Sequence, residues 1–299
     1  MNLARLARNP RATKAMIGLS YEEFTTLVPL FTHAYIAHKM ADPTRQRQVG
    51  GGIKGKLPTY EDKLFFVLFY VKNYPTFDVL GTLFDKPRGQ SCEDIHLFLK
   101  VLERTLGHAV VLPERKLTSV DEFLEKFPDV HDVFLDGGER RRERPKKPKS
   151  ERRLYSGKKK AHTRKNVIMT DARGRVLMVS PTTSGRRHDK RIADRHSFVS
   201  RIPPAVGIFA DSGFQGIQHT QPNTVVTKRG RKHAPLSEAE RENNRVIASL
   251  RIVVEHAIGG MKRFRILVDR LRMKMGLDED RLTRLCAGLW NWHLLQRGA

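Results

Sequence analysis

The sequence predicts a mixed α+β protein, in which an all-helical first half is followed by a mixed sheet covered by helices. Apolar residues recur at helical spacing from Ser20 to about Leu106. After residue 130 the pattern changes to short β-rich runs separated by turn residues. From Ser237 it becomes helical again, and strands followed by helices favour a sheet with helices packed on it.

Helix start signals recur in the first half. Each is a Ser or Thr followed three residues later by an acid, the spacing of a capping box, in which the two side chains satisfy each other's backbone donors. The pairs are Ser20 with Glu23, Thr59 with Asp62 and Ser91 with Asp94. We therefore expect an amino-terminal helix within residues 1–56, followed by two further helices. The Gly-rich basic stretch 50–56 is expected to be a flexible connector.

Residues 57–125 contain a short apolar segment, Phe77 to Phe84, then a turn with Pro87 and Gly89, then a longer helical pattern. A short helix, a turn and a longer helix predict a helix-turn-helix DNA-binding region. A purely structural helical hairpin is the alternative, because the segment after the turn carries several acids, whereas a helix facing phosphates should be basic.

The second half contains five short runs with high β propensity, at 133–135, 167–169, 176–179, 206–209 and 225–226. Asp171 to Gly174 is typical of a hairpin connection. Ser237 with Glu240 begins a long helix, and 281–296 should form a last helix that covers the sheet. We assign 126–299 to one domain.

Composition limits the classes of protein to consider. The 299 residues include 56 Lys and Arg against 32 Asp and Glu, a formal charge of +24 that attracts polyanions. The longest apolar run, Leu64 to Val71, is far shorter than the roughly 20 residues that a bilayer crossing needs. Cys92 and Cys286 form no CxxC pair, which argues against a disulfide framework and a structural zinc site. We expect a protein of a reducing compartment that binds nucleic acid and no membrane.

Half of that charge lies in the basic insertion, residues 139–165. Arg140 to Lys165 holds 14 Lys and Arg against Glu143 and Glu151. Such a run cannot bury itself, so we expect it to be disordered, or ordered only by a ligand. It is either a solvated loop or an arm that follows DNA phosphates.

Three carboxylates stand where a folded chain would rarely place them. Asp136 and Asp211 each end a strand that looks buried, and Glu255 lies between apolar residues of the long helix. Acids that converge repel one another and are stable only with cations between them, which predicts a magnesium site. Each has a plainer explanation, because Asp often starts a turn and Glu255 can pair with Arg251. Asp189 competes for one position, with a salt bridge in its basic loop as the alternative.

Residues from about 131 to 297 resemble the DDE transposases of bacterial insertion sequences, in the insertion-sequence-five group related to Harbinger-type transposases. The matching segments are 133–137, 155–163, 185–189, 210–216 and 244–264. The last is similar to the family's signature Tyr-x2-Arg-x3-Glu-x6-Lys, with Arg251, Glu255 and Lys262 at the required intervals and Ala248 in place of the Tyr. The first half also resembles the helix-turn-helix region that precedes such domains.

The resemblance implies an RNase-H-like fold with a five-stranded sheet that holds Asp136, Asp211 and Glu255 around two Mg²⁺ or Mn²⁺ ions. It implies a transposase that cuts double-stranded DNA at the element's terminal repeats and joins the 3′-OH to target DNA. The side chains expected to contact DNA are Lys158, Lys159, Lys160, His162, Arg164, Lys165, Arg251 and Lys262. We also expect a homodimer or higher oligomer in the bacterial cytoplasm, associated with the nucleoid. The alternatives are a non-catalytic DNA-binding regulator and a domesticated metal-dependent endonuclease.

Overall fold

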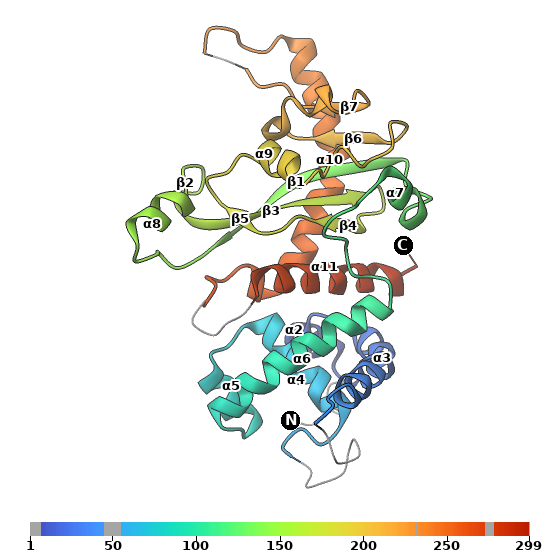
Figure 1. Cartoon of the computed structure of the whole chain (residues 1–299), viewed down its shortest axis with the longest axis vertical. Coiled ribbons are helices and arrows are strands. Elements are labelled where there is room, and N and C mark those ends of the chain that lie inside the picture. Colours follow the sequence, from blue (N-terminus) through green and yellow to red (C-terminus); the bar gives the residue numbers. More distant parts are fainter. Residues whose placement is uncertain (1–6, 45–54, 231, 273–277, 299) are drawn as a thin grey trace. The chain divides into compact units, whose positions relative to one another are not determined.

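The computed structural model describes residues 7–44, 55–230, 232–272 and 278–298 (Figure 1). The chain forms two compact units. Unit 1 consists of Met1–Leu112 and Lys262–Ala299, and unit 2 of Pro113–Met261. Helices make up unit 1, and a mixed sheet with helices makes up unit 2, so the predicted mixed α+β class is confirmed. None of the described helices is long and apolar enough to cross a membrane.

Unit 1 contains the helices predicted from the first half of the chain. Its elements are α2 (Pro10–Ile17), α3 (Tyr21–Met40), α4 (Tyr60–Asn73), α5 (Phe77–Phe84), α6 (Arg88–His108), η3 (Arg265–Leu267) and α11 (Glu279–Gln296). The capping boxes at Ser20 and Thr59 both form. The predicted start at Ser91 is wrong: α6 begins at Arg88, directly after Pro87, and Ser91 is buried within the helix. Most of the predicted connector, up to residue 54, lies outside the described residues.

The last helix of the chain belongs to unit 1. Within that unit α11 packs on α6, α3 and η3, and Arg281 and Arg284 both reach the carboxylate of Glu103 on α6, at 2.7 and 3.1 Å. The compact units therefore do not follow the sequence-based division at residue 126. Sequence order could not show this packing, because both ends of the chain contribute to one helical core.

Unit 2 is built around a mixed sheet. Its strands are β1 (Asp132–Arg141), β2 (Tyr155–Ser156), β3 (Ala161–Asp171), β4 (Val176–Val179), β5 (Thr183–Ser184), β6 (Gly207–Ala210) and β7 (Thr224–Val226). The five predicted runs are all strands, and β2 and β5 are two-residue additions. β1 lies between β3, which is antiparallel to it, and β6, which is parallel to it. β7 continues the sheet in parallel beyond β6. This is the mixed sheet that the RNase-H-like resemblance implies.

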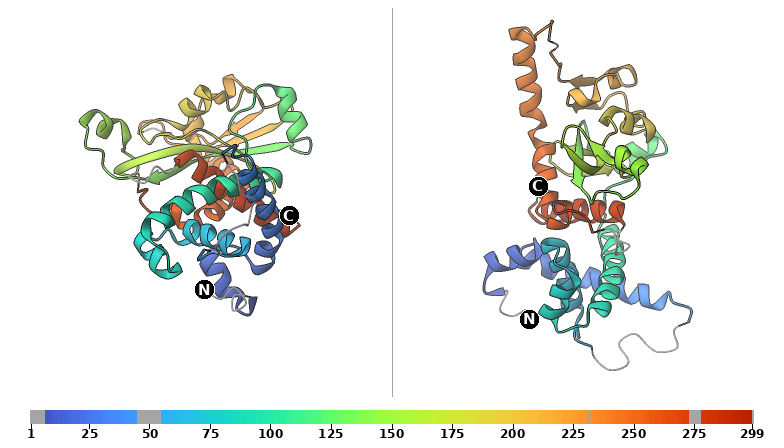
Figure 2. Two further views of the ribbon diagram at one scale, coloured as in Figure 1. Left: turned by 60° about the horizontal axis from the view of Figure 1, so that its bottom comes forward. Right: turned by 90° about the vertical axis from the view of Figure 1, so that its left-hand side faces the viewer.

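Helices cover both faces of this sheet (Figures 1 and 2). The main core lies on one face, where alternate residues of β1, β3 and β6 pack with α7 (Val120–Lys126) and α9 (Asp189–Arg195). α10 (Glu238–Lys262) runs along the other face. It begins with the predicted capping box of Ser237 and Glu240, and it continues through Gly259 and Gly260 to Lys262. Arg251, Glu255 and Lys262 therefore share one helix.

The basic insertion is ordered, so the expectation of disorder is wrong. β1 and β3 continue through it as a pair, with Glu139 opposite Lys165 and Arg141 opposite Thr163. α8 (Pro148–Leu154) follows, anchored by the buried side chain of Leu154. The two strands satisfy each other's backbone groups at the ends of the insertion, and the helix α8 satisfies its own, so these parts need little apolar core.

One buried polar contact, between Glu23 and His293, joins the two ends of unit 1. The carboxylate of Glu23, on α3, accepts a hydrogen bond from the N–H of Ser20, the helix cap, at 2.9 Å. It also contacts Nδ1 of His293, on α11, at 2.5 Å. The indole N–H of Trp292 donates to the Glu23 carbonyl at 2.9 Å. Burial raises the pKa of Glu23, but the hydrogen bonds from His293 and Ser20 outweigh it and hold that pKa below its ordinary value.

We expect Glu23→Gln to lower the free energy of unfolding by about 2 kcal/mol at neutral pH, because it leaves His293 buried without its anionic partner. A carboxylate with a lowered pKa stabilises the fold above its unfolded-state pKa, and this contribution disappears as the pH falls through the folded-state pKa. Urea titrations of the two proteins should therefore converge in acid. Glu22→Gln, at the exposed neighbouring position, is the control and should be neutral. A pH-independent difference would contradict this account.

Candidate active site

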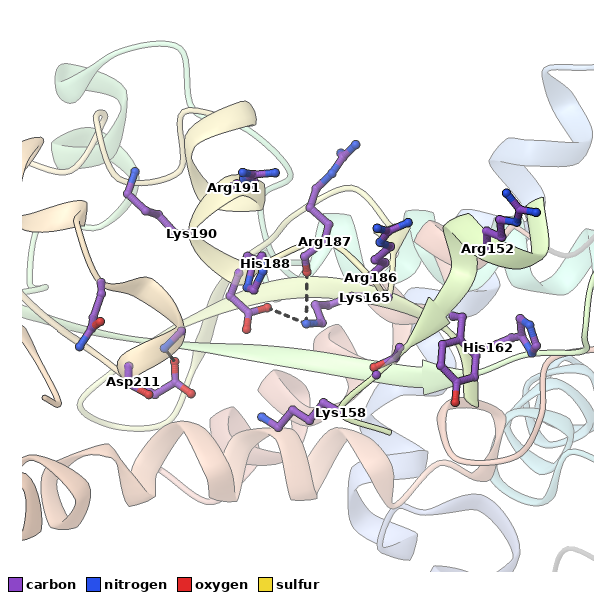
Figure 3. A pocket seen from close by; sticks show the side chains of 18 of the residues that line it. Arg152, Lys158, His162, Lys165, Arg186, Arg187, His188, Lys190, Arg191 and Asp211 are labelled. Atoms are coloured by element: carbon purple, nitrogen blue, oxygen red, sulfur yellow. Dashed lines mark hydrogen bonds and ion pairs between the residues drawn. The ribbon is translucent and has the colours of Figure 1, made fainter. Parts of the chain in front are cut away.

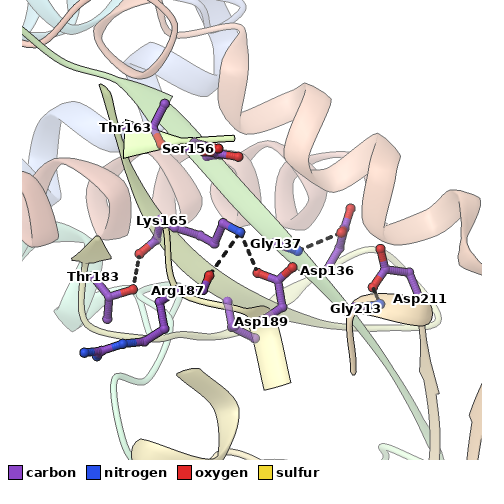
Figure 4. Close-up of polar contacts among 12 residues, drawn as sticks. Asp136, Gly137, Ser156, Thr163, Lys165, Thr183, Arg187, Asp189, Asp211 and Gly213 are labelled. Carbon is purple, nitrogen blue, oxygen red and sulfur yellow. Dashed lines mark hydrogen bonds and ion pairs between the residues drawn. The ribbon is translucent and has the colours of Figure 1, made fainter. Parts of the chain in front are cut away.

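Asp136 and Asp211 lie side by side because their strands are parallel neighbours. Leu135 of β1 pairs with Ala210 of β6, and each aspartate is the next residue along. Asp211 follows the end of β6 as predicted, but the predicted strand end at Asp136 is wrong, because β1 continues to Arg141 in its pairing with β3. Adjacent strands are about 4.8 Å apart, so the two side chains leave the sheet at one point. The Asp136 Oδ1 accepts the Gly137 N–H at 2.7 Å, and the Asp211 Oδ1 accepts the Gly213 N–H at 2.9 Å (Figure 4). Asp211 therefore also caps the turn η1 (Ser212–Phe214), which is the structural role that the sequence analysis gave as the alternative.

Asp189, at the start of α9, supplies a third carboxylate at this point. A Cβ placed on Gly137 would lie 2.8 Å from its Oδ1, and one placed on Gly213 would lie 3.0 Å from its Oδ2. Both glycines thus make room for Asp189 to approach the other two acids, as Figure 4 shows. Its ion pair is not made within its own loop. Lys165 of β3 reaches Asp189 at 3.2 Å and donates to the Arg187 carbonyl at 3.3 Å.

The pKa values reflect this crowding. Burial raises the pKa of Asp136, and the Gly137 N–H and Arg251 oppose it, whereas the charges of Asp211 and Asp189 add to it. Burial likewise raises the pKa of Asp189; Lys165 opposes this, and Asp211 adds to it. The three carboxylates are close enough to destabilise one another when ionised. A site of this kind is stabilised by a bound cation, such as a metal ion that also contacts a phosphate.

Arg251 and Glu255 approach this site from α10. The Arg251 guanidinium is buried and lies 3.8 Å from Asp136. Glu255 is four residues further along, on the same side of the helix, and is exposed. Among the described residues, no three His, Cys, Asp or Glu side chains are grouped closely enough to hold a metal ion. The structure thus brings together Asp136, Asp211, Asp189 and Arg251, with Glu255 one helical turn away from Arg251.

A basic pocket of about 1180 Å³ opens beside the carboxylates (Figure 3). It holds eight Lys and Arg side chains against Glu151, Asp189 and Asp211. The basic residues are Arg152, Lys158, Lys165, Arg186, Arg187, Lys190, Arg191 and Arg229. Asp211 lies at one end, and Arg152 and His162 lie at the other. The pocket therefore joins the acids to a strongly cationic surface that suits a polyanion.

The predicted DNA-contacting residues divide into two groups. Lys158, His162 and Lys165 line the basic pocket. The remainder do not line it: Lys159, Lys160, Arg164, Arg251 and Lys262. Lys159, Lys160 and Lys262 are exposed.

Sequence reasoning did not select the pocket residues Arg186, Arg187, Lys190, Arg191 and Arg229. The first two are in the loop that precedes Asp189, and its run of basic residues next to an acid was the available signal.

Comparisons with known proteins agree with this geometry. A family model described as DDE superfamily endonuclease matches residues 135–291, which include Asp136, Asp189, Asp211 and Glu255. The chain is also 28% identical over 290 residues, 95% of each chain, to a protein of Microchaete diplosiphon described as "Probable transposase for insertion sequence element IS702". No solved structure matches significantly. Since the family model covers more than half of the chain, the protein belongs to the DDE superfamily endonucleases.

Proposed function

We propose that this protein is a DNA transposase, which cuts the ends of an insertion sequence and joins the freed 3′-OH to target DNA. The observation that carries the proposal is the meeting of Asp136 and Asp211, each directly after the last parallel pair of β1 and β6, with a basic pocket that Asp211 lines. The family membership and the similarity to an insertion-sequence transposase along nearly the whole chain support it.

The donor set fits hard divalent cations. Carboxylate oxygens are the ligands that Mg²⁺ and Mn²⁺ prefer, and repulsion among the clustered acids is relieved by a cation. Asp136, Asp211 and Glu255 are the proposed ligands. Two such ions, when bound, would activate the attacking hydroxyl and stabilise the leaving 3′ oxygen during displacement at phosphorus.

The protein's own residues then bind and orient the DNA. Lys165 and Arg251 are buried cations whose ion-pair partners, Asp189 and Asp136, belong to the acid cluster. This places fixed positive charge next to the reacting phosphate, where a small displacement of the substrate would slow the reaction greatly. Lys158, Lys159 and Lys160, exposed on the ordered insertion, would follow the DNA backbone away from the site.

Unit 1 would hold the DNA outside the reacting nucleotides. α5 and α6 are joined by the short turn 85–87, as a helix-turn-helix requires. Two of the three acids that argued against α6 as a recognition helix have intramolecular partners: Asp94 pairs with Lys86 at 2.9 Å, and Glu103 pairs with arginines of α11, whereas Glu93 is exposed. The charges of Asp94 and Glu103 are thus partly neutralised. DNA binding by this region, dimerisation and association with the nucleoid are parts of the same proposal.

The first test measures cleavage and joining. With Mg²⁺ or Mn²⁺ and DNA bearing the element's terminal repeats, the wild type should give both 3′ nicks and joined products. Asp136→Asn, Asp211→Asn and Glu255→Gln should each reduce both steps by about a hundredfold or more, because each removes charge from the site. Glu238→Gln, exposed on the same helix as Glu255, should be as active as the wild type.

The outcomes separate the alternatives. DNA binding without cleavage would favour a non-catalytic regulator, and cleavage without joining would favour a metal-dependent endonuclease. Full activity of Glu255→Gln would exclude Glu255 as a catalytic ligand, while the proposed roles of Asp136 and Asp211 would stand.

Thermal unfolding tests the metal site without any reaction. Because the pKa of Asp136 is raised, its ionised form is less favourable in the folded chain than in the unfolded one, and stability falls as the pH rises through that pKa. Asp136→Asn should therefore raise the Tm of the metal-free protein by about 2–4 °C at neutral pH. Mn²⁺ should stabilise the wild type and have little effect on the variant. Asp129→Asn, at an exposed position in unit 2, should respond to Mn²⁺ as the wild type does; equal responses from all three would argue against the site.

Salt dependence tests the arm formed by Lys158, Lys159 and Lys160. Replacing all three by Gln should weaken binding to duplex DNA and lower the slope of log affinity against log salt by up to about three, since each lost phosphate contact removes about 0.9. The same three positions changed to Arg keep the charge and should keep the slope. An unchanged slope in the Gln variant would exclude these lysines from the DNA interface.

A further inference from the structure

The basic pocket extends beyond the carboxylates to an aromatic pair that the proposed chemistry does not use. Tyr155 and His162 both line the pocket, and Figure 3 shows His162 at the end away from Asp211. Their ring centroids are 5.6 Å apart, at an interplanar angle of 70°. The two residues face each other across β2 and β3.

Tyr155 is held in place and yet remains open to solvent. Its backbone is paired with that of His162 in the sheet, and the residue is 45% exposed. Both neighbours in the chain, Leu154 and Ser156, are buried and fix the segment. A Cβ placed on Gly157, which also lines the pocket, would meet no atom within 4 Å. The chain two residues after Tyr155 is therefore open to the surroundings rather than packed.

A rigid aromatic ring in a cationic recess suits a nucleic-acid base joined to phosphates. A paired base lies inside the stack of a duplex and offers only its edges in the grooves, so it cannot stack on a ring within a pocket. A base that has left the duplex offers its whole face. The volume of about 1180 Å³ exceeds the range for small-molecule pockets, roughly 300–1,000 Å³, and has room for a nucleotide.

We propose that this end of the basic pocket binds one unpaired nucleotide of the DNA strand at the active site, with its base on Tyr155. Arg152 and Lys158, from either side of Tyr155 in the chain, and Arg186 from the opposite loop hold its phosphates. The inference rests on the proposed function, and it adds the form of the substrate: a strand that is locally unstacked next to the carboxylates.

Two fluorescent probes test this with the full chain, in buffer without divalent ions so that no cleavage occurs. One is a blunt DNA duplex; the other is the same duplex with a single unpaired 2-aminopurine nucleotide bulged from one strand. The wild type should bind the bulged duplex about tenfold more tightly than the blunt one, the gain expected from one stacked base. The 2-aminopurine fluorescence should fall on binding, because stacking on Tyr155 quenches it.

Tyr155→Ala should lose this preference and the quenching, while its affinity for the blunt duplex stays within about twofold. Tyr155→Phe keeps the ring and should keep both effects. Val225→Ala, at another exposed position on a strand of unit 2, is the control for truncation. Equal wild-type affinity for the two probes, or an unchanged preference in Tyr155→Ala, overturns the nucleotide site alone. Failure of the wild type to bind either probe would contradict the proposed function together with it.

Discussion

The parallel pairing of β1 with β6 is the constraint on which the candidate site depends. Where the parallel pairing of two neighbouring strands stops in register, the next residues of both strands lie together, and here both residues are aspartates. The fold thereby forces two negative charges into one partly buried place. The burial that gives unit 2 its core also makes ionisation of Asp136 unfavourable. The positive charge of Lys165 and Arg251 and the space left by Gly137 and Gly213 accommodate the acids at this place.

Cations from three separate parts of unit 2 balance these acids. Lys165 comes from the middle of β3, Arg251 from α10, and the arginines before Asp189 from the loop that leads into α9. A chain with a charge of +24 is thus not uniformly basic. Asp136, Asp189 and Asp211 meet where Lys165 and Arg251 converge, and this alternation of charge suits a substrate whose phosphates carry negative charge between metal ions and side chains.

The basic insertion shows how structure changes the meaning of a composition. Fourteen Lys and Arg within 26 residues suggest a segment that cannot fold. The structure, however, gives this segment regular elements: its ends belong to β1 and β3, and between them lie α8, β2 and the turn that carries Lys158, Lys159 and Lys160. The lysines are therefore displayed from an ordered support, and Tyr155 is held at a defined position beside them.

The sequence by itself determined the elements and the chemistry of their ends. Local signals sufficed for the Ser20, Thr59 and Ser237 caps and for the five strands, because capping and alternation depend on residues close together in the chain. They also selected Asp136 and Asp211. Only the tertiary structure decided that Asp189 joins them, that its cation is Lys165, and that α11 packs with the first helices. Those contacts join residues far apart in the sequence, and no local pattern records which distant residue will fill the space that a glycine leaves.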